Sequence, residues 1–155
     1  MGSIILKPGR EESVRRRHPW VFSGAIHKIE GDPTPGETVI VFSSNDEFLG
    51  KAAYSPLSNI SARIWTWQES ENVDEEFIYQ RLARAVKLRE SLHNLIPQTN
   101  AIRLVHGESD GLPGLVVDRY QDVLVLQFLT TGAEYWRLAI LEACTKISHI
   151  QCVYE

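Results

Sequence analysis

The residues best suited to a chemical task lie near the start of the chain, where basic side chains and aromatic rings occur together. Six of these side chains are cationic or can become so: Lys7, Arg10, Arg15, Arg16, Arg17 and His18. A guanidinium group presents a planar fork of donors that suits phosphate, and an aromatic ring such as that of Trp20 can stack on a base. The pattern therefore predicts contact with nucleic acid. The alternative is a solvated helix end with Trp20 and Phe22 inside a hydrophobic core, and for Trp20 the core placement is favoured.

A second group of candidates lies on residues 59–67, where polar and apolar residues alternate as in a half-buried strand. Arg63, Trp65 and Trp67 fall on one face of this strand and could form a stacking surface. The favoured alternative is that both tryptophans contact the domain that follows. Strand parity also adds Lys51 and Arg63 to the candidate nucleic-acid-binding residues.

The pentapeptide from Gly107 to Gly111 matches the G-x-S-x-G pattern of a serine nucleophile. That motif needs a strand before the serine and a helix directly after it. Here Leu112, Pro113 and Gly114 follow, and then another strand is expected. We therefore interpret the segment as a turn whose glycines supply unusual backbone angles.

Cys144, His149 and Cys152 are the residues that could be imagined as metal ligands. Their spacing fits no common zinc pattern, and Cys144 lies on an apolar helix face, where a small buried hydrophobe is expected. The sequence also has no phosphate-binding loop and no glycine-rich turn for a nucleotide cofactor. No metal site, cofactor site or catalytic residue is therefore predicted in this chain.

The formal charge is distributed unevenly along the 155 residues. Residues 1–28 carry +4 and residues 29–155 carry −8, which together give the overall −4. A basic segment on an acidic body indicates a localised anion-binding surface. With only two cysteines, the chain is not a disulfide scaffold and suits a reducing compartment, so we expect a cytoplasmic protein. No apolar run reaches the roughly 18 residues of a membrane span, so no membrane partner is expected.

The elements that must position the basic segment are short. The pattern predicts a strand over residues 4–7, a helix over residues 11–17 and four further strands over residues 25–30, 37–43, 48–54 and 59–67. Five short strands with tight turns in fewer than 70 residues are typical of a small barrel or pseudo-barrel.

The pattern changes near residue 70, and we place a domain boundary there, giving residues 1–70 and 71–155. Asp74 is expected to cap a long helix, which is followed by a strand over residues 101–106 and a hairpin over residues 115–118 and 123–129. Thr131 and Glu134 have the spacing of a capping box and predict a helix that continues through Ile147. Residues 150–154 predict a last strand. The fold class is therefore α+β: a β pseudo-barrel followed by a small α/β domain of helix, hairpin, helix and strand.

Several long strings resemble one known family. They are R-H-P-W-V-F-S-G at residues 17–24, A-Y-S-P at 53–56, G-E-S-D-G-L-P-G at 107–114, D-R-Y at 118–120 and G-A-E-Y at 132–135. In order and spacing they resemble the bacterial ribosomal RNA large-subunit methyltransferase I family, whose members make 5-methylcytosine in 23S rRNA. One departure is Gln121, which stands where the family usually has glycine, so the turn there could differ in type.

The resemblance implies an N-terminal PUA domain and a central α/β domain, with the family's Rossmann-like methyltransferase domain beyond the end of this chain. It implies S-adenosylmethionine as the cofactor of the parent protein and none in this chain. Neither Cys144 nor Cys152 matches the position of the family's catalytic cysteine, so no catalytic residue is carried over.

PUA domains in general bind RNA, so the resemblance implies 23S rRNA as the partner. The expected RNA-binding residues are Lys7, Arg10, Arg15, Arg16, Arg17, His18, Lys51 and Arg63. A homodimer is a further possibility. Two alternatives stay open: a free-standing PUA-type RNA-binding protein without catalysis, and a structural or dimerisation module with no role in RNA binding.

Overall fold

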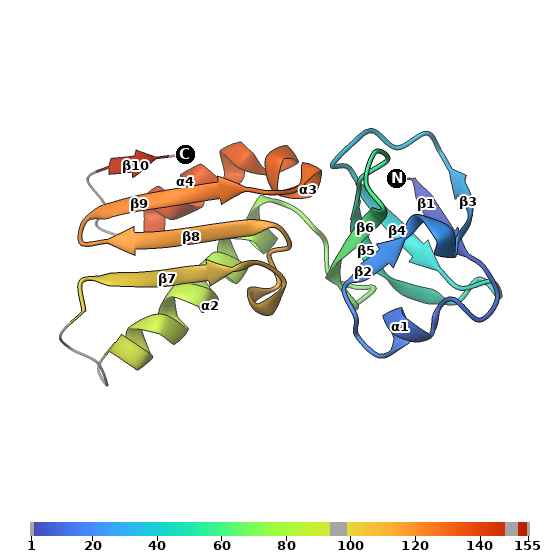
Figure 1. The fold of residues 1–155 in the computed structure, drawn as a ribbon, viewed down its shortest axis with the longest axis horizontal. Coiled ribbons are helices and arrows are strands. Elements are labelled where there is room, and N and C mark those ends of the chain that lie inside the picture. The colour runs from blue at the N-terminus through green and yellow to red at the C-terminus, as the bar shows by residue number, and fades with distance from the viewer. Residues whose placement is uncertain (1, 94–98, 148–151, 155) are drawn as a thin grey trace. The chain divides into compact units, whose positions relative to one another are not determined.

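The computed structural model describes residues 2–93, 99–147 and 152–154. The chain divides into two compact units, residues 1–73 and 74–155, which are drawn in Figure 1. The sequence pattern placed the change of organisation near residue 70, three residues before this division. Each unit is described by itself below.

The first unit is a curled six-stranded sheet in the order β2-β6-β5-β4-β1-β3 (Figure 1). Its strands are β1 (Ser3–Leu6), β2 (Trp20–Phe22), β3 (Ile26–Glu30), β4 (Thr38–Phe42), β5 (Phe48–Tyr54) and β6 (Ile60–Thr66). The β1 and β4 strands pair in parallel, and all other neighbours in this sheet are antiparallel. The predicted β pseudo-barrel is confirmed.

The core of this unit comes from strand residues that alternate in burial. Ile4 and Leu6 of β1 and Val39 and Val41 of β4 are completely buried, because side chains two residues apart lie on the same face of a strand. The short helix α1 (Glu12–Arg15) adds Val14 to the same cluster. Burial of Val14 therefore anchors α1, which contains Arg15 and is followed directly by Arg16 and Arg17.

Two predictions for this unit are corrected. Strand β2 was not predicted, and α1 covers Glu12–Arg15 rather than residues 11–17. The helix ends because Arg17 adopts a left-handed conformation with φ of 66°. There the Arg17 N–H donates to Val14 O and the His18 N–H to Ser13 O, both at 2.9 Å. This is a Schellman ending, which satisfies the last helical carbonyls and turns the chain toward β2.

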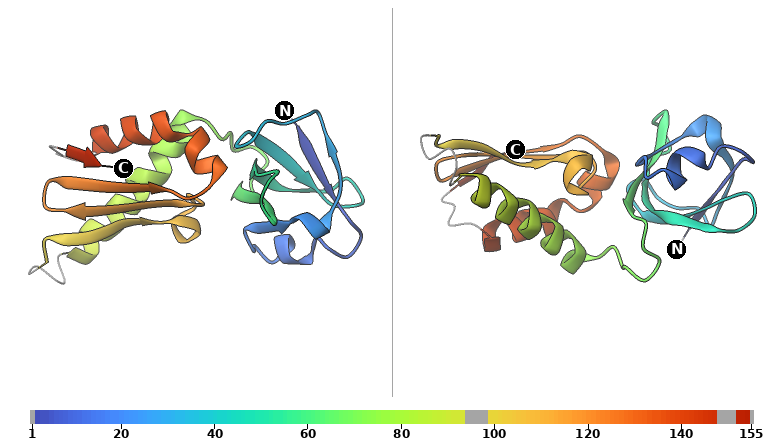
Figure 2. Two further views of the ribbon diagram at one scale, coloured as in Figure 1. Left: turned by 45° about the horizontal axis from the view of Figure 1, so that its top comes forward. Right: turned by 90° about the horizontal axis from the view of Figure 1, so that it is seen from below.

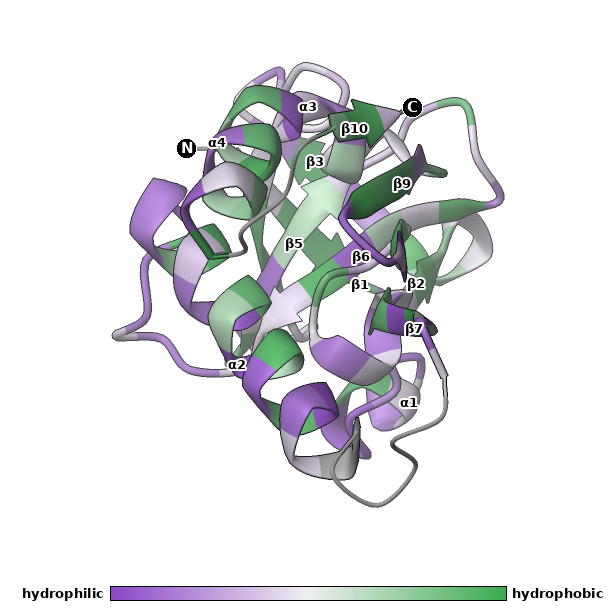
Figure 3. Ribbon diagram, turned by 90° about the vertical axis from the view of Figure 1, so that its left-hand side faces the viewer, coloured by the Kyte–Doolittle hydropathy of each residue, from purple (hydrophilic) through white to green (hydrophobic). Residues whose placement is uncertain are grey.

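The second unit is a four-stranded sheet in the order β10-β9-β8-β7, with two helices packed on one face (Figure 2). Its elements are α2 (Glu75–His93), β7 (Ala101–His106), β8 (Leu115–Tyr120), β9 (Val123–Phe128), α3 (Thr131–Tyr135), α4 (Arg137–Ile147) and β10 (Cys152–Tyr154). Apolar and polar residues alternate around α2, whereas β9 is almost entirely apolar (Figure 3). Ile78, Leu82 and Ala85 form the buried stripe of α2. The predicted α/β arrangement is confirmed, and residues 150 and 151 of the predicted last strand lie outside the described residues.

The helix ends of this unit show one prediction confirmed and one corrected. The carboxylate of Asp74 accepts a hydrogen bond from the Phe77 N–H at 2.9 Å, as expected of a cap. The second cap is Thr130 rather than Thr131, because Thr130 is extended while its hydroxyl accepts from the Ala133 N–H at 3.2 Å. The helix predicted after it is divided at Trp136 into α3 and α4.

The hairpin between β8 and β9 also differs from the prediction. The strands extend to Tyr120 and from Val123, so the connection is two residues long. Gln121 has φ of 56° and its N–H donates to Asn100 O at 2.7 Å. The chain therefore adopts the left-handed conformation that favours glycine, although glutamine occupies the position.

Candidate nucleic-acid interface

Most exposed cations of the first unit lie around α1, and Lys28 on β3 is paired with Glu30. Arg10 and Lys7 are exposed, and Lys7 donates to Gly24 O at 3.0 Å. The side chain of Arg16 is 82% exposed, and its Nε lies 3.9 Å from Glu12. Among the described residues, no carboxylate pairs with Arg10 or Arg17, so these two guanidinium groups keep their donors for an anion.

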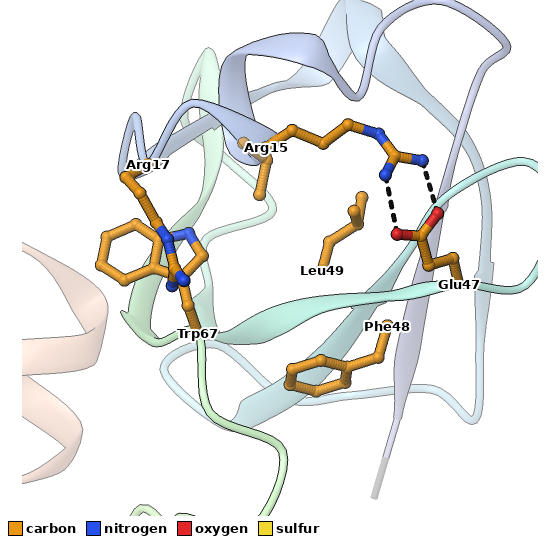
Figure 4. A pocket seen from close by; sticks show the side chains of 7 residues that line it. Arg15, Arg17, Glu47, Phe48, Leu49 and Trp67 are labelled. Carbon is orange, nitrogen blue, oxygen red and sulfur yellow. Dashed lines mark hydrogen bonds and ion pairs between the residues drawn. The ribbon is translucent and has the colours of Figure 1, made fainter.

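Arg17 is the most constrained of these cations. A non-glycine residue with φ near 66° is disfavoured by contact between Cβ and the following carbonyl, at a cost of about 1 kcal/mol. The same conformation sends the guanidinium across the ring of Trp67, with Cζ 5.4 Å from the ring centroid (Figure 4). Trp67 itself packs against the core cluster of this unit. The arginine therefore lies on a fixed aromatic support instead of moving freely in solvent.

Arg15, by contrast, is engaged within the protein. Its two terminal nitrogens donate to the two carboxylate oxygens of Glu47 at 2.7 and 2.6 Å (Figure 4). This hydrogen-bonded pair lowers the pKa of Glu47 and raises the pKa of Arg15. Both groups are solvent-accessible, with side-chain exposures of 35% and 55%, so water and salt screen the pair.

Between these two arginines the first unit has a pocket of about 270 Å³. Its lining residues come from α1 and the segment after it, from the hairpin loop before β5, from β5 and from the end of β6: Val14, Arg15, Arg17, Glu47, Phe48, Leu49 and Trp67. The lining therefore combines apolar and aromatic side chains with three charged ones, Arg15, Arg17 and Glu47 (Figure 4).

A row of rings follows Arg17 along β2. The rings of His18 and Trp20 meet edge to face at 5.4 Å between centroids, and those of Trp20 and Phe22 at 6.3 Å. Trp20 is half-buried and lies outside the core cluster, and Phe22 is 49% exposed. The core placement that was favoured for Trp20 and offered for Phe22 is therefore wrong. The reason is the strand period, which buries Val21 and turns its two neighbours outward. Trp20 pairs across the sheet with Arg63, so β2 and β6 bring these two candidates together.

The structure does not bring Lys51 to this surface. Lys51 is only 7% exposed, and its ammonium donates to Glu71 O at 2.7 Å. Glu71 also bonds Thr66 through its carboxylate. Arg63 is half-buried, with one nitrogen 3.4 Å from Ile60 O. Trp65 is 1% exposed and offers no stacking surface.

The G-E-S-D-G motif at residues 107–111 of the second unit forms a turn that is bonded to helix α2. Residues 107–110 form a 3-10 turn that ends at Gly111 with φ of 70°, so no helix follows Ser109 as a nucleophile would need. Asp110 accepts two hydrogen bonds from Arg89, at 2.5 and 2.7 Å, and one from the His106 N–H at 2.7 Å. The motif therefore fastens the loop after β7 to helix α2.

The described residues give no support to a metal site. Cys144 is 4% exposed, and burial raises the pKa of its thiol to about 12, which disfavours the thiolate that a metal needs. His149 lies outside the described residues. Over the described parts of the chain, no three metal-binding side chains come together, and no helix is both long and apolar enough to cross a membrane.

Sequence reasoning missed the part of the pocket that comes from the β4–β5 hairpin. Residues 44–47 were expected to form a loop, which they do. The sequence holds no signal that this loop would place Glu47 beside Arg15, 32 residues earlier. Only the pairing of β4 with β5, together with the packing of α1 on β5, determines that contact.

The fold and the exposed cations define the class of the first unit: residues 4–67 match the family model described as a PUA-like domain. Comparison with curated proteins shows which proteins the whole chain is similar to. A ribosomal RNA large subunit methyltransferase I from Erwinia tasmaniensis is 47% identical over 152 residues, which cover 98% of this chain and 38% of that protein. A protein of the same name from Yersinia pseudotuberculosis is 49% identical over 140 residues, covering 90% of this chain and 35% of that protein.

Solved structures agree on the fold. A putative SAM-dependent methyltransferase from Streptococcus mutans superposes with a TM-score of 0.77 at 16% identity, over 95% of this chain and 38% of that one. A putative methyltransferase complexed with SAH superposes with a TM-score of 0.79 at 17% identity, over 95% of this chain and 37% of that one. The resemblance drawn from the sequence motifs is thereby confirmed: the chain is homologous to the N-terminal part of the large-subunit methyltransferase I proteins. It spans between 35% and 38% of the length of the two curated relatives.

Proposed function

We propose that this chain is the RNA-contacting portion of an S-adenosylmethionine-dependent 23S rRNA (cytosine-C5) methyltransferase. In this proposal the first unit holds structured rRNA by its phosphates and presents it to the methyl-transferring part of the whole protein. The cofactor is bound by that other part. The curated relatives carry the methyltransferase name, and the PUA-like match supports RNA as the ligand of the first unit.

The observation that carries the proposal is the set of exposed, unpaired guanidinium groups on an otherwise acidic chain. Arg10 and Arg17 have no carboxylate partner among the described residues, and Arg16 has only a distant one. Residues 29–155 have a net charge of −8, so a polyanion is attracted to the N-terminal segment and repelled elsewhere. Phosphate contacts of this kind fix the register of an RNA without reading its sequence.

The test is fluorescence anisotropy of the chain with a labelled 23S rRNA hairpin, from about 50 to about 200 mM salt. We expect saturable binding that weakens steeply with salt. Replacing both Arg16 and Arg17 by alanine should reduce the affinity about tenfold and lower the salt slope by about two, because two phosphate contacts are lost. The matched control is Arg84→Ala with Lys87→Ala, which removes the same charge from exposed positions of α2.

Equal losses in the two double variants would show that net charge alone governs binding, and the proposed surface would be wrong. Unchanged affinity and slope in the Arg16 and Arg17 variant would contradict it as well. The alternative of a purely structural module predicts that result.

A further inference from the structure

We infer that the pocket between Arg15 and Arg17 receives the base of one unpaired nucleotide of the bound RNA. This inference rests on the proposed function, because it names what part of an RNA the first unit holds. It also goes beyond that function, because phosphate contacts along a basic surface need no pocket. The exposed arginines would hold the backbone, and the pocket would hold a base that has left the helical stack.

The size and lining of the pocket fit a flat heteroaromatic ring. Its volume of about 270 Å³ lies just below the range typical of sites for drug-sized molecules. The indole of Trp67 and the ring of Phe48 line it beside the buried side chain of Leu49. Every base has a π face that can stack on such rings, so stacking binds a base without choosing its identity.

The rim carries charges in an arrangement that suits a nucleotide rather than an apolar ligand. The Arg17 guanidinium lies over the Trp67 ring, where it can contact the phosphate of the nucleotide whose base enters the pocket (Figure 4). Glu47 stands at the other side. Each of its carboxylate oxygens accepts one hydrogen bond from Arg15, and a carboxylate oxygen can accept a second.

Glu47 therefore supplies an acceptor but no donor at the inner rim. A carboxylate oxygen can accept a hydrogen bond from the exocyclic amino group of adenine, cytosine or guanine, or from the ring N–H of guanine or uracil. Arg15 keeps the carboxylate ionised, since the hydrogen bond from Arg15 lowers the pKa of Glu47. Arg17 is left-handed, with φ of 66°, at a helix end where glycine is the ordinary choice.

The test compares four RNA hairpins of one stem sequence: a bulged adenosine, a bulged uridine, a bulged abasic residue and a fully paired stem. The three bulged hairpins carry the same number of phosphates. We expect the adenosine bulge to bind about fivefold or more tightly than the abasic bulge, because a stacked base is gained. The uridine bulge should bind between the two.

Variants assign the effect to the pocket. In Trp67→Leu the ratio of adenosine to abasic affinity should approach one, while the salt slope stays as in the original chain. Because Trp67 also packs on the core, its variant is checked by circular dichroism, and Glu47→Gln is the second variant. Glu47→Gln should lower the ratio of adenosine to abasic affinity, because the charged acceptor for a base N–H is lost. Each ratio is taken within one protein, so the change in net charge cancels.

The outcomes separate the inference from the proposed function. Salt-dependent binding with equal affinity for all four hairpins would overturn the pocket and leave the phosphate surface standing. Absence of binding to any hairpin would overturn both. A base-dependent ratio that survives in both Trp67→Leu and Glu47→Gln would place the base elsewhere and contradict the inference.

Discussion

The two units use arginine in different ways. In the second unit Arg89, Arg103 and Arg137 each make two hydrogen bonds to one carboxylate, from Asp110, Asp118 and Glu134 respectively. Near α1 of the first unit, Arg15 makes such a bidentate pair, whereas Arg10, Arg16 and Arg17 make none among the described residues. Three arginines therefore fasten the second unit, where Arg84 stays exposed, whereas three arginines near α1 keep charge for a partner.

The number of arginines in a segment therefore does not show how many can bind an anion, because some are already paired with carboxylates. An arginine that makes two parallel hydrogen bonds to one carboxylate has already used the donors that a phosphate would need.

The largest loss is expected from the buried pair of the second unit. In Arg89→Met the carboxylate of Asp110 is left buried without its cation, since the side chains are 16% and 6% exposed. Such a loss costs about 3–5 kcal/mol of unfolding free energy. Urea unfolding measures it, with Lys87→Met as a control on an exposed position of the same helix. A change equal to that of the control would mean that the pair does not fasten the loop.

The next largest loss of stability is expected when Gly114 is replaced by alanine, and Gly9, which has a similar backbone angle, is the comparison. Gly114 of the second unit has φ of +78°, and an added Cβ would collide with the side chain of Thr130. Gly9 of the first unit has φ of +75°, and nothing lies within 4 Å of its added Cβ.

In both alanine variants the left-handed conformation lowers the free energy of unfolding by about 1 kcal/mol. Gly114→Ala adds the collision, about 1–3 kcal/mol more. Thermal unfolding compares the two, and a loss for Gly9→Ala as large as that for Gly114→Ala would contradict this difference in packing.

A smaller effect of opposite sign is expected at Arg17. Glycine relieves the strained φ of 66° but gives up the contact with Trp67 and adds freedom to the unfolded chain. Arg17→Gly should therefore keep or raise the stability by up to about 1 kcal/mol, while RNA affinity falls. Arg17→Ala is the companion variant, which loses the charge and keeps the strain. A marked loss of stability in the glycine variant would show that Arg17 is retained for the fold and not for a partner.

The smallest effect is a dependence of stability on pH at Asp118. The hydrogen bond from Arg103 lowers the pKa of Asp118 below its unfolded value. This contribution is therefore complete above the unfolded pKa of about 3.9 and is lost as the pH falls through the lower folded value. Unfolding curves between about pH 6 and pH 2 should converge for the original chain and Asp118→Asn at the acid end. A constant difference across that range would show that the pair makes no pH-dependent contribution.

Much of the fold could be predicted because its signals are local. Alternating burial defines β1, and Asp74 begins α2 with a cap that can be predicted from residue type and spacing. Strand β2 was missed because three residues after a proline carry no clear alternation by themselves. Its register with β6 exists only in the folded sheet.

The candidate site could be predicted only in part. The basic segment was evident from composition, but which of its members stay available depends on contacts between distant residues. Arg15 is occupied by a carboxylate from another hairpin, and Lys51 is buried under Glu71. The aromatic support of Arg17 lies 50 residues further along the chain. Residue type suggests the chemistry, and topology decides which groups can perform it.

The most direct test of the account is a titration of the isotope-labelled chain with a 23S rRNA hairpin, followed by backbone amide NMR shifts. We expect the largest shifts at Arg16, Arg17 and His18 and along strand β5. Amides of Arg89, Arg103 and Arg137 should stay nearly unchanged. Shifts concentrated on those three residues of the second unit, with the first unit silent, would contradict the division between available and fastened arginines.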